Sequence, residues 1–145
     1  PLSDKARQAL YPALRQAIAG KSPAEAANVL IHFVQRAFDY QTDQQQFGYE
    51  RPLFADETLN YPYSDCEDRS ILFSVLIREL LGLDVVLINY PNHLATAVCF
   101  DEEVTGDYLE IDRRRFIVCD PTYIGADIGR TMPGMDNQTA EIIRL

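Results

Sequence analysis

The sequence predicts an α+β domain, because three helical patterns come first and four short runs of β-forming residues follow them. Turn residues separate those runs by only a few positions, and such short connections join antiparallel neighbours. Helices that precede an antiparallel sheet are typical of α+β folds. With 145 residues the chain has the length of one domain. We expect residues 1–145 to form that domain, either alone or as part of a longer protein.

The first helix is predicted over residues 3–19, where apolar residues recur at helical spacing and Gly20 follows as a stop signal. Pro12 lies in the middle of this pattern and cannot donate a backbone hydrogen bond. We therefore expect the helix to be interrupted at Pro12 or to begin there.

The second helix is expected to begin after Ser22, whose hydroxyl can cap its first turn. Pro23 suits the first helical position, and Glu25 stands where a side chain can return a hydrogen bond to the capping residue. The helical pattern continues to about Phe38.

The third helix is predicted over residues 68–81, which are apolar on nearly every side and end at Gly82. Such a helix belongs in the centre of the core. The β-forming runs come after it, at residues 85–90, 93–100, 108–111 and 115–120.

Charge and hydropathy exclude two classes of function. The formal net charge is −9, and lysine and arginine do not form the positive footprint that a phosphate backbone requires, so we expect no nucleic-acid partner. No apolar run approaches the roughly 20 residues that span a bilayer, so we expect no membrane insertion in this segment. The compartment is left open, because a longer secreted precursor would make the domain extracytoplasmic.

Cys66 is one of three cysteines, an odd number that raises the question of a reactive thiol. It stands at the expected start of the third helix, where unpaired backbone N–H groups and the positive end of the helix dipole favour a thiolate. Asp65, Glu67 and Asp68 oppose this effect unless they point outward and cap the helix. Activation of Cys66 is therefore expected to depend on a cationic partner.

His93 is the better candidate for that partner, because it opens a predicted strand directly after a turn. His32 lies inside the second helix, where we interpret it as an ordinary core or surface histidine. Asp120 ends a later strand and can accept a hydrogen bond from the second ring nitrogen of His93, which fixes the tautomer and stabilises imidazolium. Together, Cys66, His93 and Asp120 form a workable catalytic triad.

Five short motifs stand out along the chain, and three of them contain Cys66, His93 and Asp120. The motifs are Asp56-Glu57-Thr58-Leu59, Asp65-Cys66-Glu67-Asp68-Arg69-Ser70, Leu80-Leu81-Gly82-Leu83, Asn92-His93-Leu94-Ala95-Thr96-Ala97-Val98 and Cys119-Asp120-Pro121-Thr122. In residue type, order and spacing, over about residues 28–125, the chain resembles the bacterial transglutaminase-like superfamily. The resemblance implies a papain-like core, with the cysteine at the tip of a central helix that packs on an antiparallel sheet. It matches Cys66, His93 and Asp120 to the family's Cys, His and Asp. Ser64 stands where many members carry glycine.

Strand parity predicts where the other two cysteines point. Alternate residues of a strand share a face, so Cys99 is expected on the same face as His93. Asp120 has to face His93, which sends its neighbour Cys119 to the opposite face. We therefore expect no disulfide between Cys99 and Cys119 and interpret both as small core residues.

Ala95 and Ala97 share the His93 face by the same parity. Because their side chains are small, we expect the central helix to approach the sheet on this face, which would hold Cys66 close to His93.

An oxyanion hole is expected to use the backbone N–H of Cys66, because a fixed donor there meets the charge that develops in a tetrahedral intermediate. A second donor is expected from one of three side chains: Tyr40, Asn60 and Tyr63.

Residues 41–63 are polar, rich in glutamine and broken by glycine and proline, which predicts a long loop. Because this segment leads into the nucleophile and carries several aromatic residues, we expect it to form one wall of the substrate cleft, with Tyr61 and Tyr63 contacting substrate. The alternative is that its aromatic residues seal the helices against the sheet. In that case the cleft lies around Asn92 and Tyr123.

Neither a metal nor another cofactor is expected. Asp65, Glu67 and Asp68 lack the regular alternate spacing of a calcium loop, and we interpret them as helix-capping and solvated charges.

The expected function is hydrolysis of an amide bond in a peptide or protein, through an acyl-thioester at Cys66 that water resolves. Resemblance to bacterial members, many of which are peptidases or amidases, favours hydrolysis. Transfer of the acyl group of a protein glutamine to an amine shares the same first half and stays open, as does a non-catalytic module of a larger protein.

Overall fold

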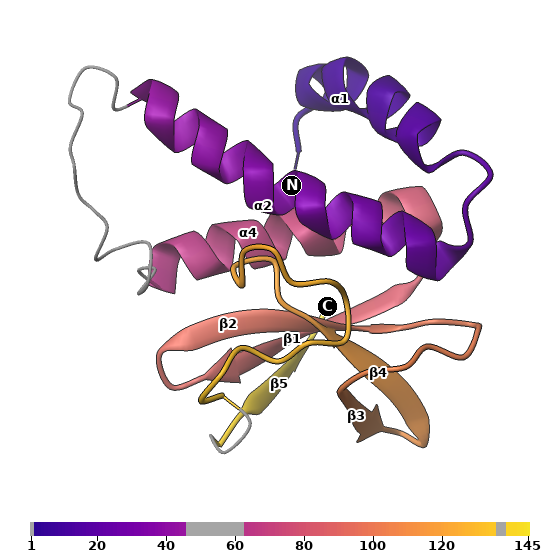
Figure 1. Cartoon of the computed structure of the whole chain (residues 1–145), viewed down its shortest axis with the longest axis vertical. Coiled ribbons are helices and arrows are strands. Elements are labelled where there is room, and N and C mark those ends of the chain that lie inside the picture. Colours follow the sequence, from indigo (N-terminus) through magenta and orange to yellow (C-terminus); the bar gives the residue numbers. More distant parts are fainter. Residues whose placement is uncertain (1, 46–62, 136–138) are drawn as a thin grey trace.

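The computed structural model describes residues 2–45, 63–135 and 139–145 and has the α+β architecture that the sequence predicts. In Figure 1 the helices lie on one side of the sheet, with α4 nearest to it and α1 outermost. The helices are α1 (Asp4–Ile18), α2 (Pro23–Gln45) and α4 (Tyr63–Leu76), which continues into the π-helical turn η1 (Ile77–Leu81).

The sheet has five strands in the order β3-β4-β2-β1-β5, and every neighbouring pair is antiparallel. The strands are β1 (Asp84–Tyr90), β2 (His93–Cys99), β3 (Tyr108–Ile111), β4 (Arg114–Cys119) and β5 (Glu141–Arg144). The first four match the predicted runs to within one residue at each end. The edge strand β5, which pairs with β1, is not among the predicted strands.

Helix α1 runs without a break through Pro12, so the expected interruption is wrong. Contacts on both sides of the proline offset its missing hydrogen bond. Before it, Tyr11 is buried and donates to Glu79 Oε1 at 2.6 Å, and Arg7 pairs with the same carboxylate. After it, Leu14 is buried in the core.

Helix α2 begins with the predicted capping arrangement. The Glu25 N–H donates to Ser22 Oγ at 3.2 Å, and the Ser22 N–H donates to Glu25 Oε1 at 3.0 Å. The helix continues past Phe38 to Gln45, and Tyr63 begins α4, so the prediction of a loop is wrong for residues 41–45 and for Tyr63. Residues 46–62 of that predicted loop lie outside the described part of the chain.

Helix α4 begins at Tyr63, earlier than the predicted residue 68, and its continuation η1 ends as expected just before Gly82. Gly82 has a φ of +67°, which a residue without a Cβ adopts readily. Phe73, Leu76 and Ile77 are fully buried. Burying each such side chain contributes about 1.5 to 3 kcal/mol, which explains why this helix occupies the centre of the fold.

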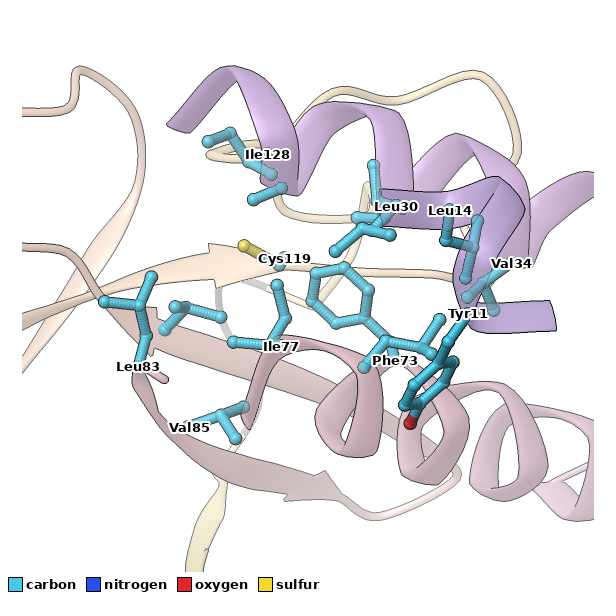
Figure 2. Packing of buried hydrophobic residues seen from close by; sticks show 14 residues of the cluster. Tyr11, Leu14, Leu30, Val34, Phe73, Ile77, Leu83, Val85, Cys119 and Ile128 are labelled. Carbon is cyan, nitrogen blue, oxygen red and sulfur yellow. The ribbon is translucent and has the colours of Figure 1, made fainter. Parts of the chain in front are cut away.

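The main core fills the space between the helices and the sheet (Figure 2). Phe73 and Ile77 lie among Leu30 of α2, Val85 of β1 and Cys119 of β4. A second cluster covers the opposite face of the sheet and consists of Val86, Ile88, Tyr90, Ala95, Ala97, Phe116 and Val118. Both faces of the central strands are therefore buried.

Candidate active site

Cys66 lies in the first turn of α4, as its fourth residue, and not just before the helix as predicted. It is only 1% exposed and packs against Leu87 of β1 and Leu94 of β2. The thiol is therefore held at the N-terminal end of the helix, where the dipole favours negative charge.

His93 is the first residue of β2 and follows the two-residue turn that joins β1 to β2. Its Nδ1 lies 3.2 Å from Cys66 Sγ. Only 5% of the residue is exposed. The ring of Tyr90, the residue paired with His93 across the hairpin, stacks on the imidazole with the ring centroids 6.1 Å apart.

Asp120 follows directly after β4 and is 2% exposed. Its Oδ2 lies 2.6 Å from His93 Nε2, and its Oδ1 accepts the Thr122 N–H at 2.9 Å. The neighbouring strands hold this geometry, because Thr96 of β2 donates to the carbonyl oxygen of Cys119 at 2.6 Å. The structure thus brings together the three residues of the predicted triad.

The electrostatics of the site follow from this burial and pairing. Burial lowers the pKa of His93, but the hydrogen bonds to Asp120 and Cys66 outweigh that effect and raise the pKa to about 10. His93 therefore carries its proton at neutral pH and presents a cation to the Cys66 sulfur.

The approach of α4 to the sheet differs from the prediction. Cys66 contacts Leu87 and Leu94, which lie on the face opposite Ala95 and Ala97. Small residues do allow the close approach, but they belong to the helix. They are Ser70, which donates to the carbonyl oxygen of Leu94 at 3.1 Å, and Ser74.

Cys99 and Cys119 lie on opposite faces of the sheet, as parity predicts. Cys119 belongs to the main core, and burial raises the pKa of its thiol. Cys99 is half-buried and packs against the opposite cluster. Both are free cysteines.

The remaining predicted residues have different positions. Asn92 is exposed in the turn before His93. Tyr123 is half-buried, and the guanidinium carbon of Arg130 lies 5.5 Å from its ring centre. Tyr40 lies in α2 and Tyr63 in α4, with side chains outside the described part.

Asn60 and Tyr61 also lie outside the described residues. The second oxyanion donor and the cleft wall at residues 41–63 therefore stay predictions.

The acidic residues next to Cys66 point largely away from it, because Glu67 and Asp68 are exposed and Asp65 is half-buried. Within the described ranges no group of three or more His, Cys, Asp or Glu residues could hold a metal ion. In the same part of the chain, none of the helices has both the length and the apolar character needed to cross a membrane.

Two further buried polar residues contact the segments that carry the site and were not predicted. Ser70 lies one helical turn after Cys66, and a polar residue on the sheet-facing side of a buried helix is the signal that could have identified it. Gln35 is 2% exposed on the core face of α2, one turn after the buried Ile31. A polar side chain on an otherwise apolar helix face needs hydrogen-bond partners, and this is the sequence signal that could have identified Gln35.

Comparisons of the chain with protein-family models, with curated proteins and with solved structures found no match.

Proposed function

We propose that this protein is a cysteine hydrolase with a papain-like core of the transglutaminase-like type, which cleaves an amide bond in a peptide or protein. The observation that carries the proposal is the chain of contacts at the site. Cys66 Sγ lies 3.2 Å from His93 Nδ1, and His93 Nε2 lies 2.6 Å from Asp120 Oδ2. A nucleophile, a base and an orienting carboxylate in this order are the parts that covalent acyl chemistry needs.

Acylation starts from a Cys66 thiolate beside a protonated His93. The sulfur attacks the carbonyl carbon of the amide and forms a C–S bond, and we expect the backbone N–H of Cys66 to stabilise the oxyanion. The C–N bond then breaks as His93 gives its Nδ1 proton to the leaving nitrogen. An acyl-thioester, a neutral His93 and a free amine result.

Deacylation reverses the role of His93. The neutral imidazole takes a proton from water, whose oxygen attacks the thioester carbon. The C–S bond breaks, a carboxylic acid leaves, and the thiolate and imidazolium are restored. Asp120 keeps the ring in one orientation and stabilises the imidazolium at both stages.

Hydrolysis and acyl transfer differ only in the group that resolves the thioester. The resemblance to bacterial members favours water. An amine in place of water would give the transglutaminase reaction.

The test uses p-nitrophenyl acetate, an activated acyl donor that does not depend on the natural substrate. We expect a burst of nitrophenolate and an acetyl group on Cys66, located by peptide mass spectrometry.

Turnover should persist in Cys99→Ala and vanish in Cys66→Ala. Added n-butylamine competes with water for the acetyl-thioester in the deacylation step. Acetate as the main product supports hydrolysis, and N-butylacetamide supports acyl transfer. Equal acetylation of the three cysteines, or none at Cys66, would contradict the proposal and favour a non-catalytic module.

A further inference from the structure

Helix α2 presents a row of polar side chains to the loop that follows Asp120. The row consists of Asn28, His32 and Gln35, which lie four and three residues apart and so share one face of the helix. Apart from a contact between His32 and Gln35, their side-chain partners among the described residues belong to residues 123–128. In Figure 1 this loop rises from the end of β4 toward α2.

Gln35 makes the densest of these contacts. Its Nε2 donates to the carbonyl oxygens of Tyr123 and Ala126, each at 3.1 Å. Its Oε1 accepts the Gly125 N–H at 3.0 Å and lies 3.0 Å from His32 Nδ1. Both amide hydrogens and an oxygen lone pair are thus engaged by backbone groups of the loop, which fixes the orientation of the side chain.

The turn that Gln35 holds also carries Asp120. The Asp120 carbonyl oxygen accepts the Tyr123 N–H at 3.2 Å, and its Oδ1 accepts the Thr122 N–H at 2.9 Å. The segment from Asp120 to Tyr123 therefore forms one hydrogen-bonded unit. One end of this unit faces His93, and the other end is bonded to Gln35.

We propose that Gln35 is a positioning residue, which holds the turn at Tyr123 and thereby keeps the Asp120 carboxylate against Nε2 of His93. The inference rests on the proposed function, in which Asp120 orients His93. A buried amide is well suited to this task, because an unpaired carbonyl at Tyr123 or Ala126 would have to move to find water or another donor.

Asn28 provides a matched control. It is a second amide on the same face of α2, and its Oδ1 accepts the Ile128 N–H at 2.8 Å. Ile128 is five residues beyond Tyr123 and adjoins Gly129, which is bonded directly to β4 through the Val118 carbonyl oxygen. Loss of the Asn28 bond should therefore loosen the loop without displacing Asp120.

The experiment is a proton NMR titration of the His93 ring in the full chain, with Gln35→Met and Asn28→Leu as near-isosteric variants that remove only the hydrogen bonds. The chain has two histidines, so a His32→Asn variant completes the assignment. In Gln35→Met the titration midpoint of His93 should fall by about 1 pH unit, because the carboxylate is held less well. In Asn28→Leu it should stay at the wild-type value.

A midpoint that is unchanged in Gln35→Met, or that falls equally in both variants, would overturn the proposal. If Gln35→Met does not fold, Gln35→Asn retains an amide on a shorter stem and should show the same fall. Failure of both variants to fold would assign Gln35 to global stability and overturn the proposal as well.

This readout separates the two proposals, because the titration requires no turnover. A wild-type protein that does not acetylate Cys66, together with a lowered His93 midpoint in Gln35→Met, would remove the hydrolase and leave the role of Gln35 intact.

Discussion

Two histidine–aspartate pairs within the described residues have nearly equal lengths but different surroundings. His93 Nε2 lies 2.6 Å from Asp120, and His32 Nε2 lies 2.7 Å from Asp127. The side chains of the first pair are 7% and 2% exposed, whereas those of the second are 27% and 65% exposed. Water can therefore solvate the second pair, and it cannot reach the first to the same degree.

The other ring nitrogen marks a second difference. Nδ1 of His93 faces the Cys66 thiol, and Nδ1 of His32 faces the amide oxygen of Gln35. A histidine–carboxylate pair is thus not by itself a sign of catalysis. The proposed function needs a buried pair with a nucleophile on the other side of the ring, and His93 meets both requirements.

The largest expected effect separates the two histidines directly. His93→Asn should reduce turnover of p-nitrophenyl acetate by about 10³ to 10⁴-fold, because it removes both the partner of the thiolate and the base for deacylation. His32→Asn should reduce it by less than about tenfold, through the loop contacts alone. Steady-state nitrophenolate release measures both variants.

Circular dichroism of both variants should show the wild-type fold. A comparable loss of turnover in the two variants would remove the distinction between the pairs.

The next effect concerns the aspartates. Asp120→Asn keeps the shape of the side chain but offers His93 an amide, so turnover should fall by about 10²-fold or more while the fold persists. The hydrogen bond to Asp120 raises the pKa of His93, so its loss should move the His93 NMR midpoint from about 10 toward its ordinary value of 6.5.

The sign of the accompanying stability change follows from linkage. Because the pKa of His93 is raised in the folded state, its stabilising contribution is complete below about pH 6.5 and is lost as the pH rises through about 10. Wild-type protein should lose this part of its stability in urea between those pH values, and Asp120→Asn should lose less. Asp127→Asn is the control and should change turnover by less than about threefold. Unfolding of Asp120→Asn without a specific loss of turnover would make Asp120 a structural turn residue.

Sequence patterns predicted the elements whose apolar residues follow a recognisable spacing and are also buried in the core. The apolar residues of α4 and the four runs that became β1 to β4 were identified because each fills a core from consecutive or alternating positions. The edge strand β5 has only four residues, Glu141–Arg144, with two adjacent isoleucines that show neither period. The end of α2 was missed because residues 39–45 are mostly polar and carry no apolar face.

The triad was predictable because its members stand at element ends, where side chains reach a common point. The face of β2 that receives α4 was not, because all residues from His93 to Val98 are buried and the strand shows no alternation. The role of Gln35 depends on a loop that lies about ninety residues away in sequence, and local spacing cannot report such a contact.

The smallest effect tests how α4 is held against the strand of His93. Ser70 and Ser74 are both buried, but only the Ser70 hydroxyl has a hydrogen-bond partner among the described residues. Ser70→Ala should lower the free energy of unfolding by about 1 kcal/mol. Ser74→Ala should leave it within about 0.5 kcal/mol or raise it. Urea denaturation compares the two, and equal losses would show that the bond to Leu94 does not hold the helix.

The most direct test of Cys66 as the nucleophile is the rate of alkylation by iodoacetamide at each cysteine at neutral pH, followed by mass spectrometry. Cys99 is the internal control, because it is half-buried, whereas Cys66 is only 1% exposed. Exposure alone would make Cys99 the faster thiol. We expect the reverse in the wild-type protein, because protonated His93 lies 3.2 Å from the Cys66 sulfur and stabilises negative charge that develops there. In His93→Asn, Cys66 should react more slowly than Cys99. A wild-type protein in which Cys99 reacts faster than Cys66, or in which His93→Asn leaves the Cys66 rate unchanged, would contradict the assignment of Cys66 as the nucleophile.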